Sequence, residues 1–397
     1  MDALMLPLNW QRVRLGDVAE IIGGGTPSTQ ITSFWNGSIN WFTPTEIGIT
    51  KYVYKSQRTI TLLGLKKSSA KLLPIGTILL TSRASIGDCA ILKVVATTNQ
   101  GFQSLIPLEK INNEFLYYLI LTLKNKLLEL ASGSTFLEVS PNKIKNLLIP
   151  LPPLNEQIAI ANILSDVDHY LYSLDALILK KESVKKALSF ELLSQRKRLK
   201  GFNQNWQRVR LGDICEFGNG EAYETLIVEN GNFKLISLNS IDIDGNLKNT
   251  MKRVNFYDNS LKQDDIVMVL SDVAHGDFLG LCAVIPSNDY VLNQRMGRLR
   301  KRNDCINILF LRLYINANQK YFKMQGQGSS QLNLSKKAIE DFEILLPPLN
   351  EQIAIANILS GLDHEIISLK NKKRQFENIK KALNHDLMSA KIRVLKK

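Results

Sequence analysis

The sequence has few of the residues and runs that mark secreted, membrane-spanning or metal-binding proteins. Its four cysteines are widely scattered and form no CxxC pair, which indicates neither a disulfide framework nor a zinc site. No apolar run approaches the roughly 18–20 residues that a membrane-spanning helix needs. Residues 1–10 lack the basic start and apolar core of a signal peptide. We therefore expect a cytoplasmic protein with reduced cysteines and no association with membranes.

The motifs of common catalytic sites are also missing. There are only four histidines, and no HExxH, G-x-S-x-G or Walker A motif is present. The Pro-Pro pairs are followed by leucine rather than by the aromatic residue of a DNA amino-methyltransferase motif. The single glycine cluster, at residues 23–25, runs into Thr-Pro-Ser and predicts a turn rather than a nucleotide site. We therefore predict no catalytic residues, no metal, no cofactor, and neither nuclease nor methyltransferase activity in the isolated chain.

What is abundant is positive charge. The formal net charge is +13 over 397 residues, which favours a polyanionic partner, nucleic acid before an anionic membrane surface. Hydrophobic residues make up 45% of the chain, enough for packed cores, and the length suggests two or three domains.

The chain contains an internal duplication. The nine-residue sequence NWQRVRLGD at residues 9–17 recurs unchanged at residues 205–213. The sequence LPPLNEQIAIANILS at residues 151–165 recurs unchanged at residues 346–360. Between these blocks, residues 18–130 and 214–325 look unlike each other. The pattern indicates two copies of one frame that carry two different inserts.

A long helix is predicted after each Pro-Pro pair. Apolar residues recur there in steps of four and three, and this mean step of 3.5 is the period of a coiled-coil seam. The seam residues are Ile160, Leu164, Val167, Leu171, Leu174 and Ile178 in the first copy, and Ile355, Leu359, Leu362, Ile366 and Leu369 in the second. We expect the two helices to pair antiparallel. The alternative is two amphipathic helices buried in separate domains, but typical globular helices are much shorter.

The inserts have the patterns of mixed α/β structure. Short apolar runs at residues 77–81, 90–95, 266–270 and 281–285 predict strands, and residues 115–130 and 309–317 predict helices. The predicted fold is therefore two α/β (α+β) domains separated by an antiparallel two-helix coiled coil, with internal pseudo-twofold duplication. The predicted boundaries are 1–150 and 201–345 for the two domains, and 151–200 and 346–397 for the two helical segments.

Two motifs, together with this arrangement of domains and helices, make the chain resemble a known family. The helices begin with P-P-L-x-E-Q, at residues 152–157 and 347–352, and the domains begin with W-x-x-V-x-L-G-D, at residues 10–17 and 206–213. Two divergent domains between near-identical helical segments resemble the specificity subunit of type I restriction–modification systems. The resemblance covers essentially the whole chain.

The resemblance implies a division of labour between the domains and the helices. Each domain would be a target-recognition domain that reads one half of a bipartite site in double-stranded DNA. The helices would set the half-site spacing and dock two methyltransferase subunits, and motor–nuclease subunits would join that complex in phage defence. The resemblance places partner binding in the P-P-L-x-E-Q motifs, at Pro153, Leu154, Glu156, Gln157, Pro348, Leu349, Glu351 and Gln352.

Candidate base-reading residues follow from chemistry alone, because Arg and Lys read guanine and Asn and Gln read adenine. The candidates are Ser82, Arg83, Asn99, Gln100 and Thr135 in the first domain, and Ser271, Asn293, Gln294, Arg295, Gln327 and Gln331 in the second. The alternative for any one of them is a polar loop residue that caps a turn. The alternative for the whole chain is a coiled-coil adaptor whose inserts bind proteins. The Lys/Arg-rich helix ends fit either a solvated face or phosphate contacts.

Overall fold

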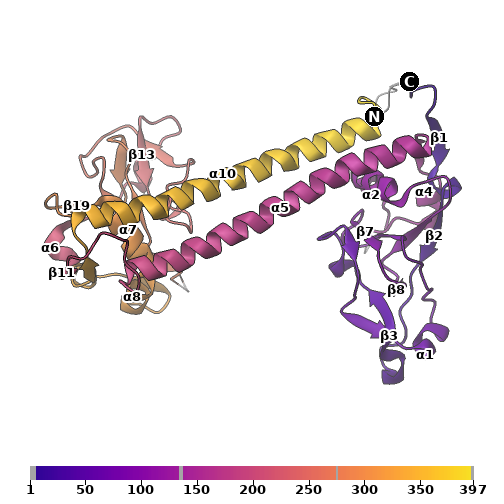
Figure 1. Ribbon diagram of the computed structural model, residues 1–397, viewed down its shortest axis with the longest axis horizontal. Helices are drawn as coiled ribbons and strands as arrows, with labels where there is room; N and C mark the ends of the chain where they lie inside the picture. Colours follow the sequence, from indigo (N-terminus) through magenta and orange to yellow (C-terminus); the bar gives the residue numbers. More distant parts are fainter. Residues whose placement is uncertain (1–5, 134–136, 274–275, 395–397) are drawn as a thin grey trace. The chain divides into compact units, whose positions relative to one another are not determined.

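The computed structural model describes residues 6–133, 137–273 and 276–394 and divides the chain into two compact units (Figure 1). Unit 1 comprises Met1–Asp175 and Asn371–Lys397, and unit 2 comprises Ala176–Lys370. Each unit therefore contains one of the two inserts and a part of both long helices. The four segment boundaries predicted from the sequence are not the boundaries of these units, and they stay predictions.

Unit 1 is built on two small sheets. A five-stranded sheet has the order β2-β9-β6-β7-β4, and a three-stranded sheet has the order β5-β3-β8. The strands of the first are β2 (Ala19–Gly23), β9 (Gln103–Pro107), β6 (Ile78–Leu80), β7 (Cys89–Leu92) and β4 (Tyr52–Val53). Those of the second are β5 (Arg58–Ile60), β3 (Trp35–Phe42) and β8 (Ala96–Thr98).

Unit 2 repeats this strand order, without a counterpart of β4, although the insert sequences look unrelated. Its four-stranded sheet has the order β12-β19-β15-β17, and its three-stranded sheet has the order β14-β13-β18. The strands are β12 (Cys215–Asn219), β19 (Met296–Lys301), β15 (Ile266–Val269), β17 (Cys282–Val284), β14 (Lys252–Val254), β13 (Phe233–Ile236) and β18 (Tyr290–Leu292). In both three-stranded sheets one neighbour of the central strand is antiparallel and the other is parallel.

Helices complete each insert. They are α1 (Leu62–Lys66), α2 (Asn113–Thr122), α3 (Lys124–Leu130) and α4 (Pro141–Lys145) in unit 1, and α6 (Leu211–Ile214), α7 (Ile308–Ala317), α8 (Gln319–Gln325) and α9 (Lys336–Glu340) in unit 2. The predicted strands and helix α7 are confirmed. The single helix expected at residues 115–130 is two helices, α2 and α3, because the backbone leaves helical geometry at Leu123.

The two ends of each insert are paired directly with each other. Strand β1 (Gln11–Arg14) pairs antiparallel with β10 (Leu148–Leu151), and β11 (Gln207–Arg210) pairs antiparallel with β21 (Glu343–Leu346). These strands belong to the duplicated frame. The frame therefore closes each insert at its base, whatever sequence lies between.

The long helices are α5 (Leu154–Leu193) and α10 (Leu349–Met388), each of 40 residues. In unit 1 they pack antiparallel: Asp168 pairs with Lys380, and the Asp175 carboxylate lies 2.6 Å from the Lys373 ammonium. Tyr170 and Phe376 meet between these two ion pairs. Because residue numbers rise on one helix as they fall on the other, the predicted antiparallel pairing is confirmed.

The same pairing continues within unit 2, where Lys181 and Lys185 occupy the next two positions of the four-and-three spacing after Ile178 and so interrupt the apolar seam. Lys185 pairs with Asp363, and the Lys181 ammonium lies 2.8 Å from the Glu365 carboxylate. A lysine in an otherwise apolar stripe is therefore matched by an acid on the facing helix. No helix among the residues described is long and apolar enough to cross a membrane.

Both helices contribute to the core of each unit. The main core of unit 1 includes Ile160 and Leu164 of α5 together with Leu387 of α10. The main core of unit 2 includes Leu192 of α5 together with Leu359 of α10. Each core is therefore completed by the start of one long helix and the end of the other.

We expect Leu164→Ala to destabilise unit 1 by about 2–5 kcal/mol, because the side chain is fully buried and its loss leaves a cavity. Denaturant unfolding of the full chain measures this. Leu179→Ala is the matched control on the same helix: Leu179 is 64% exposed, and its effect should stay within about 0.5 kcal/mol. Equal losses from the two variants would contradict this account of the core.

Candidate nucleic-acid interface

Four of the predicted residues of the first domain come together at the ends of two strands. Ser82 follows β6, and its amide donates to the carbonyl of Gly101 at 2.8 Å. The Gly101 amide in turn donates to the side-chain oxygen of Asn99 at 2.9 Å. Arg83 and Gln100 are the next residues along these two segments. We refer to residues 81–83 and 99–101 as the first recognition loops.

The four residues differ in how free they are to meet a ligand. Ser82 is buried and its hydroxyl donates to the Gly101 carbonyl. Arg83 is part-exposed but forms an ion pair of 2.7 Å with Glu138. Gln100 is exposed and accepts a hydrogen bond from Thr26. Thr135, the fifth candidate of this domain, lies outside the described residues.

In the second domain, Asn293 and Gln294 follow β18 as Asn99 and Gln100 follow β8. Both side-chain amides donate to one carboxylate, that of Glu224, at 2.8 Å from Asn293 and 3.1 Å from Gln294. The Asn293 oxygen accepts the amide of Tyr223, so this buried side chain is fully engaged. Arg295 is exposed and has a left-handed backbone with φ of +67°. We refer to residues 293–295 as the second recognition loop.

The remaining candidates of this domain form a separate group. Ser271 lies in β16 (Ser271–Val273), which pairs with β20 (Gln331–Asn333), and the Ser271 hydroxyl donates to Asn333. Gln327 also pairs with Asn333 through backbone hydrogen bonds in both directions. The structure therefore brings Ser271, Gln327 and Gln331 onto one small strand pair.

Glu224 is a site residue that the sequence reasoning missed. Partial desolvation alone would raise the pKa of its carboxyl, but hydrogen bonds from Asn293, the backbone and Gln294 hold that pKa below its usual range. The adjacent Tyr223 donates to Asp258, and burial together with this bond raises the pKa of Tyr223 to about 12. Glu224 lies about 70 positions before the amides it binds, so no local sequence pattern marks it.

A close backbone approach supports both recognition loops. A Cβ atom at Gly24 would lie 1.9 Å from the carbonyl oxygen of Asn99, and one at Gly220 would lie 2.0 Å from that of Asn293. Only glycine fits at such distances. The glycine cluster at residues 23–25 is therefore a site where the backbone packs against the loop. The turn predicted there is wrong: Gly23 ends β2, and Gly24 and Gly25 continue in irregular structure.

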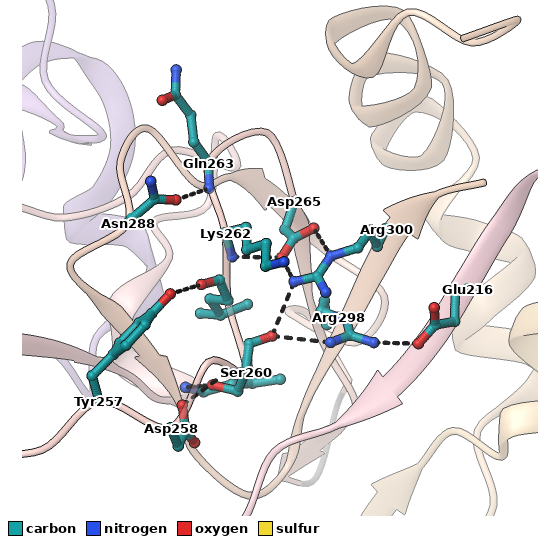
Figure 2. A network of polar contacts seen from close by, with 12 residues as sticks. Glu216, Tyr257, Asp258, Ser260, Lys262, Gln263, Asp265, Asn288, Arg298 and Arg300 are labelled. Carbon is teal, nitrogen blue, oxygen red and sulfur yellow. Dashed lines mark hydrogen bonds and ion pairs between the residues drawn. The ribbon is translucent and has the colours of Figure 1, made fainter. Parts of the chain in front are cut away.

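An arginine network anchors the strand that leads into the second recognition loop (Figure 2). Arg300 binds both oxygens of the buried Asp265, at 2.8 and 2.6 Å. Arg298 binds Glu216 at 2.6 Å and donates to the carbonyl of Ser260 at 3.2 Å. The Ser260 hydroxyl accepts the amide of Leu292, the residue before the recognition loop. The network thereby ties the end of β18 to the four-stranded sheet.

The P-P-L-x-E-Q motif holds each long helix to its own insert. The Gln157 side chain donates to the carbonyls of Pro152 and Lys110 and accepts the amide of Asn112. Gln352 makes the same three bonds, to Pro347, Cys305 and Asn307. These two glutamines are fully buried, so they fix the start of the helix against the loop before α2 or α7.

The glutamate of the motif forms a second clamp. The Glu156 carboxylate accepts from the Trp10 indole at 3.1 Å and from Arg393 at 2.8 Å. In unit 2, Glu351 accepts from the Trp206 indole at 3.0 Å and from Arg198 at 2.6 Å. Each clamp joins the start of a domain, the start of one helix and the segment after the end of the other.

The two arginines of the clamp were not predicted. Arg198 and Arg393 occupy equivalent positions of the duplication, and this register could have identified them. The partner-binding prediction for the motifs stays a prediction. Pro153 and Pro348 are half-buried, and Leu154 and Leu349 are exposed (46% and 38%), whereas the glutamates and glutamines face inward.

The described residues contain no group of three His, Cys, Asp or Glu side chains that could hold a metal ion. Cys89, Cys215 and Cys282 are buried, and burial raises the pKa of the Cys215 thiol to about 12. The first and second recognition loops offer hydrogen-bond donors and acceptors together with the positive charges of Arg83 and Arg295. Such a set is suited to binding the edges of bases and phosphate groups.

The fold and these regions define a class: a tandem-domain protein with two α/β modules of one topology on a shared pair of antiparallel helices. Residues 7–181 and 203–378 each match the family model of the type I restriction modification DNA specificity domain. Because these matches cover most of the chain, it belongs to the family of type I restriction–modification specificity subunits. The family resemblance read from the sequence is confirmed.

Individual relatives agree with this assignment. The chain is 42% identical over 171 residues to the MjaIX specificity subunit of Methanocaldococcus jannaschii, a match that spans 42% of this chain and 40% of that relative. It is 27% identical over 423 residues to the MjaVIII specificity subunit of the same organism, across 99% of this chain and 95% of the relative. The crystal structure of the S subunit from M. genitalium has the same fold, with a TM-score of 0.63 at 21% identity over 97% of this chain and 98% of that one.

We expect Glu351→Gln to lower the free energy of unfolding by about 1.5–3 kcal/mol, because the buried hydrogen bonds lose their negative partner and the new amide nitrogen cannot accept. Glu182→Gln is the matched control: Glu182 forms an exposed ion pair of 2.7 Å with Lys370, and such pairs contribute at most about 1 kcal/mol. Denaturant unfolding of the two variants compares them. A Glu351→Gln variant as stable as the control would show that the clamp does not hold unit 2 together.

Proposed function

We propose that this chain is the sequence-specific DNA-recognition subunit of a type I restriction–modification complex. Each domain reads one half of a bipartite site in double-stranded DNA, and the chain itself carries no catalytic residues. The observation that carries the proposal is the duplicated frame: one frame is built twice, and it carries two inserts whose sequences look unlike each other. Identical frames with unlike inserts suit a protein that reads two unlike half-sites.

The partner surfaces follow from the same duplication. The P-P-L-x-E-Q segments recur without change, so any protein that docks on one copy meets the same surface on the other. We propose that two methyltransferase subunits bind there, and that motor–nuclease subunits join through that complex. The exposed Leu154 and Leu349 are the apolar side chains of the motif available to such a partner. The buried Glu156, Gln157, Glu351 and Gln352 act indirectly, because they fix the backbone that presents these leucines.

Exchange of one insert tests the modular reading. We expect replacement of residues 18–130 by the same region of a relative to change one half of the methylated sequence only. The frame strands and the helices remain native, so the second half-site and the gap should persist. Mapping of methylated sites in the host genome measures this, and exchange of residues 214–325 is the reciprocal control. A change in both halves after a single exchange would contradict one domain per half-site.

We further propose that the helix pair sets the number of base pairs between the half-sites. DNA rises about 3.4 Å per base pair, and a helix rises about 1.5 Å per residue. Lengthening the pair by four residues therefore adds about 6 Å, close to two base pairs, and about 40° of rotation. The ion pairs of Lys181 and Lys185 with α10 mean that both helices must be lengthened together if their register is to be kept.

We expect a paired insertion of four residues, after Lys181 in α5 and after Ile366 in α10, to lengthen the recognised gap by one or two base pairs. Both half-sites should stay the same, and methylation mapping reads both quantities. The control is insertion in α5 alone, which shifts the facing ion pairs and should reduce assembly. An active, folded paired variant with an unchanged gap would show that the helices do not set the distance.

A further inference from the structure

The inserts cannot be aligned by sequence, but the strand pairings of their three-stranded sheets show which residues occupy equivalent positions. In unit 1, Arg58 at the start of β5 pairs with Trp41 of β3, and Trp41 pairs with Thr97 of β8. Asn99 follows two residues after Thr97. Arg58 therefore stands at the same end of the sheet as the first recognition loops, two strands across from β8.

The same construction in unit 2 places a lysine at the equivalent position. Lys252 at the start of β14 pairs with Leu235 of β13, and Leu235 pairs with Val291 of β18. Asn293 follows two residues after Val291. Neighbouring strands lie about 4.8 Å apart, so in each unit the backbone of the basic residue is about 10 Å from the strand that leads into the recognition loop.

Arg58 is held in place by aromatic rings and not by acids. Its guanidinium lies 3.8 Å from the centre of the Trp35 ring and 5.3 Å from that of Trp41. Both rings are almost fully buried, whereas Arg58 is exposed. Its guanidinium has no hydrogen bond or ion pair with any described residue. Stacking of this kind orders the side chain while its N–H groups remain free to donate.

Lys252 lies in a basic cleft. The cleft has a volume of about 500 Å³ and is also lined by Lys234, Arg253, Ser237 and Thr250. None of the described residues that line it is acidic. Lys234 is paired with Asp289 at 3.0 Å, whereas the exposed Lys252 has no ion pair with a described residue. Arg253 donates to the carbonyl of Gly231 at 3.0 Å and likewise has no ion pair with a described residue. The cleft therefore suits a phosphate group, with Lys252 and Arg253 as the charges that no described acid pairs.

We propose that Arg58 and Lys252 bind backbone phosphates of duplex DNA beside the base-reading loops, one in each domain. This inference rests on the proposed function and adds the residues that fix each domain on its half-site. Arg and Lys can also read guanine. Arg58 and Lys252 lie two strands across from the strands that lead into the base-reading candidates, and one domain has arginine where the other has lysine. Both residue types bind phosphate, however, and phosphates are present in every sequence.

The test is the salt dependence of DNA binding by the full chain in complex with its methyltransferase subunits. Arg58→Gln and Lys252→Gln each remove one positive charge. In Arg58→Gln, the glutamine amide keeps a planar group over the Trp35 ring. We expect each variant to lower the magnitude of the slope of log affinity against log salt by about 0.9. The loss of affinity should be the same on the cognate duplex and on an unrelated duplex, and the methylated motif should be unchanged. Arg12→Gln is the matched control, an exposed arginine of β1 with no ion pair to a described residue, and it should leave the slope unchanged.

The outcomes separate this inference from the proposed function. If the wild-type complex does not bind duplex DNA, the proposed function fails. If the wild-type complex binds and both variants keep its slope, the phosphate assignment alone is overturned. A variant that relaxes the methylated motif at one base pair would also overturn it, in favour of a base contact. Unchanged unfolding transitions confirm that the variants are folded.

Discussion

An apolar stripe along a 40-residue helix must be covered over its whole length, and this requirement governs the architecture. Neither insert could cover such a stripe alone, because each meets only one end of a long helix. The chain solves this with a second copy of the helix that runs the other way. Within each unit, the start of one helix and the end of the other enter a single hydrophobic core, and acid–lysine pairs replace apolar contacts where the seam is interrupted.

The glutamate and glutamine at the start of each long helix attach that helix to its domain. Gln157 and Gln352 form hydrogen bonds with backbone groups of the adjoining loop. Glu156 and Glu351 each accept hydrogen bonds from an indole and a guanidinium that belong to segments far apart in the chain. Buried charge is tolerated here because every carboxylate oxygen has a donor. The unchanged repetition of these residues therefore has a structural cause, whether or not a partner also binds nearby.

The sequence was sufficient for the elements that depend on local or repeated patterns. The 3.5-residue period predicted the helix pair, the alternation of apolar runs and turns predicted the buried strands, and exact repetition predicted two copies of one frame. The strand order that the inserts share could not be predicted, because strand order depends on pairings between distant segments with dissimilar side chains. The helical stretch at residues 115–130 was predicted as one element because the break at Leu123 has no proline or glycine to mark it.

For the candidate site, the position of the Asn-Gln pairs after a strand was visible in the sequence, and their neighbours were not. The fold alone places Glu224 against the second recognition loop and Arg58 at the same end of the sheet as the first recognition loops. Chemistry alone also ranked Ser82 and Asn293 with exposed residues such as Gln100, although both are buried and engaged within the chain. Residue type indicates what a side chain can bind, and only packing decides whether it is free to do so.

The discontinuity of unit 1 has a consequence for the order in which the molecule is completed. Unit 2 is one uninterrupted stretch, whereas unit 1 needs residues 371–397 to join residues 1–175. The bond between Glu156 and Arg393 spans 237 positions. During synthesis, unit 2 is therefore complete before unit 1, because the last residues of unit 1 are made after those of unit 2. Domains generally fold from the N-terminus onward. Until Leu387 is made, the apolar side chains around Leu164 in the core of unit 1 stay partly exposed. In the nascent chain, the domain that is made first is therefore the last whose core can be completed.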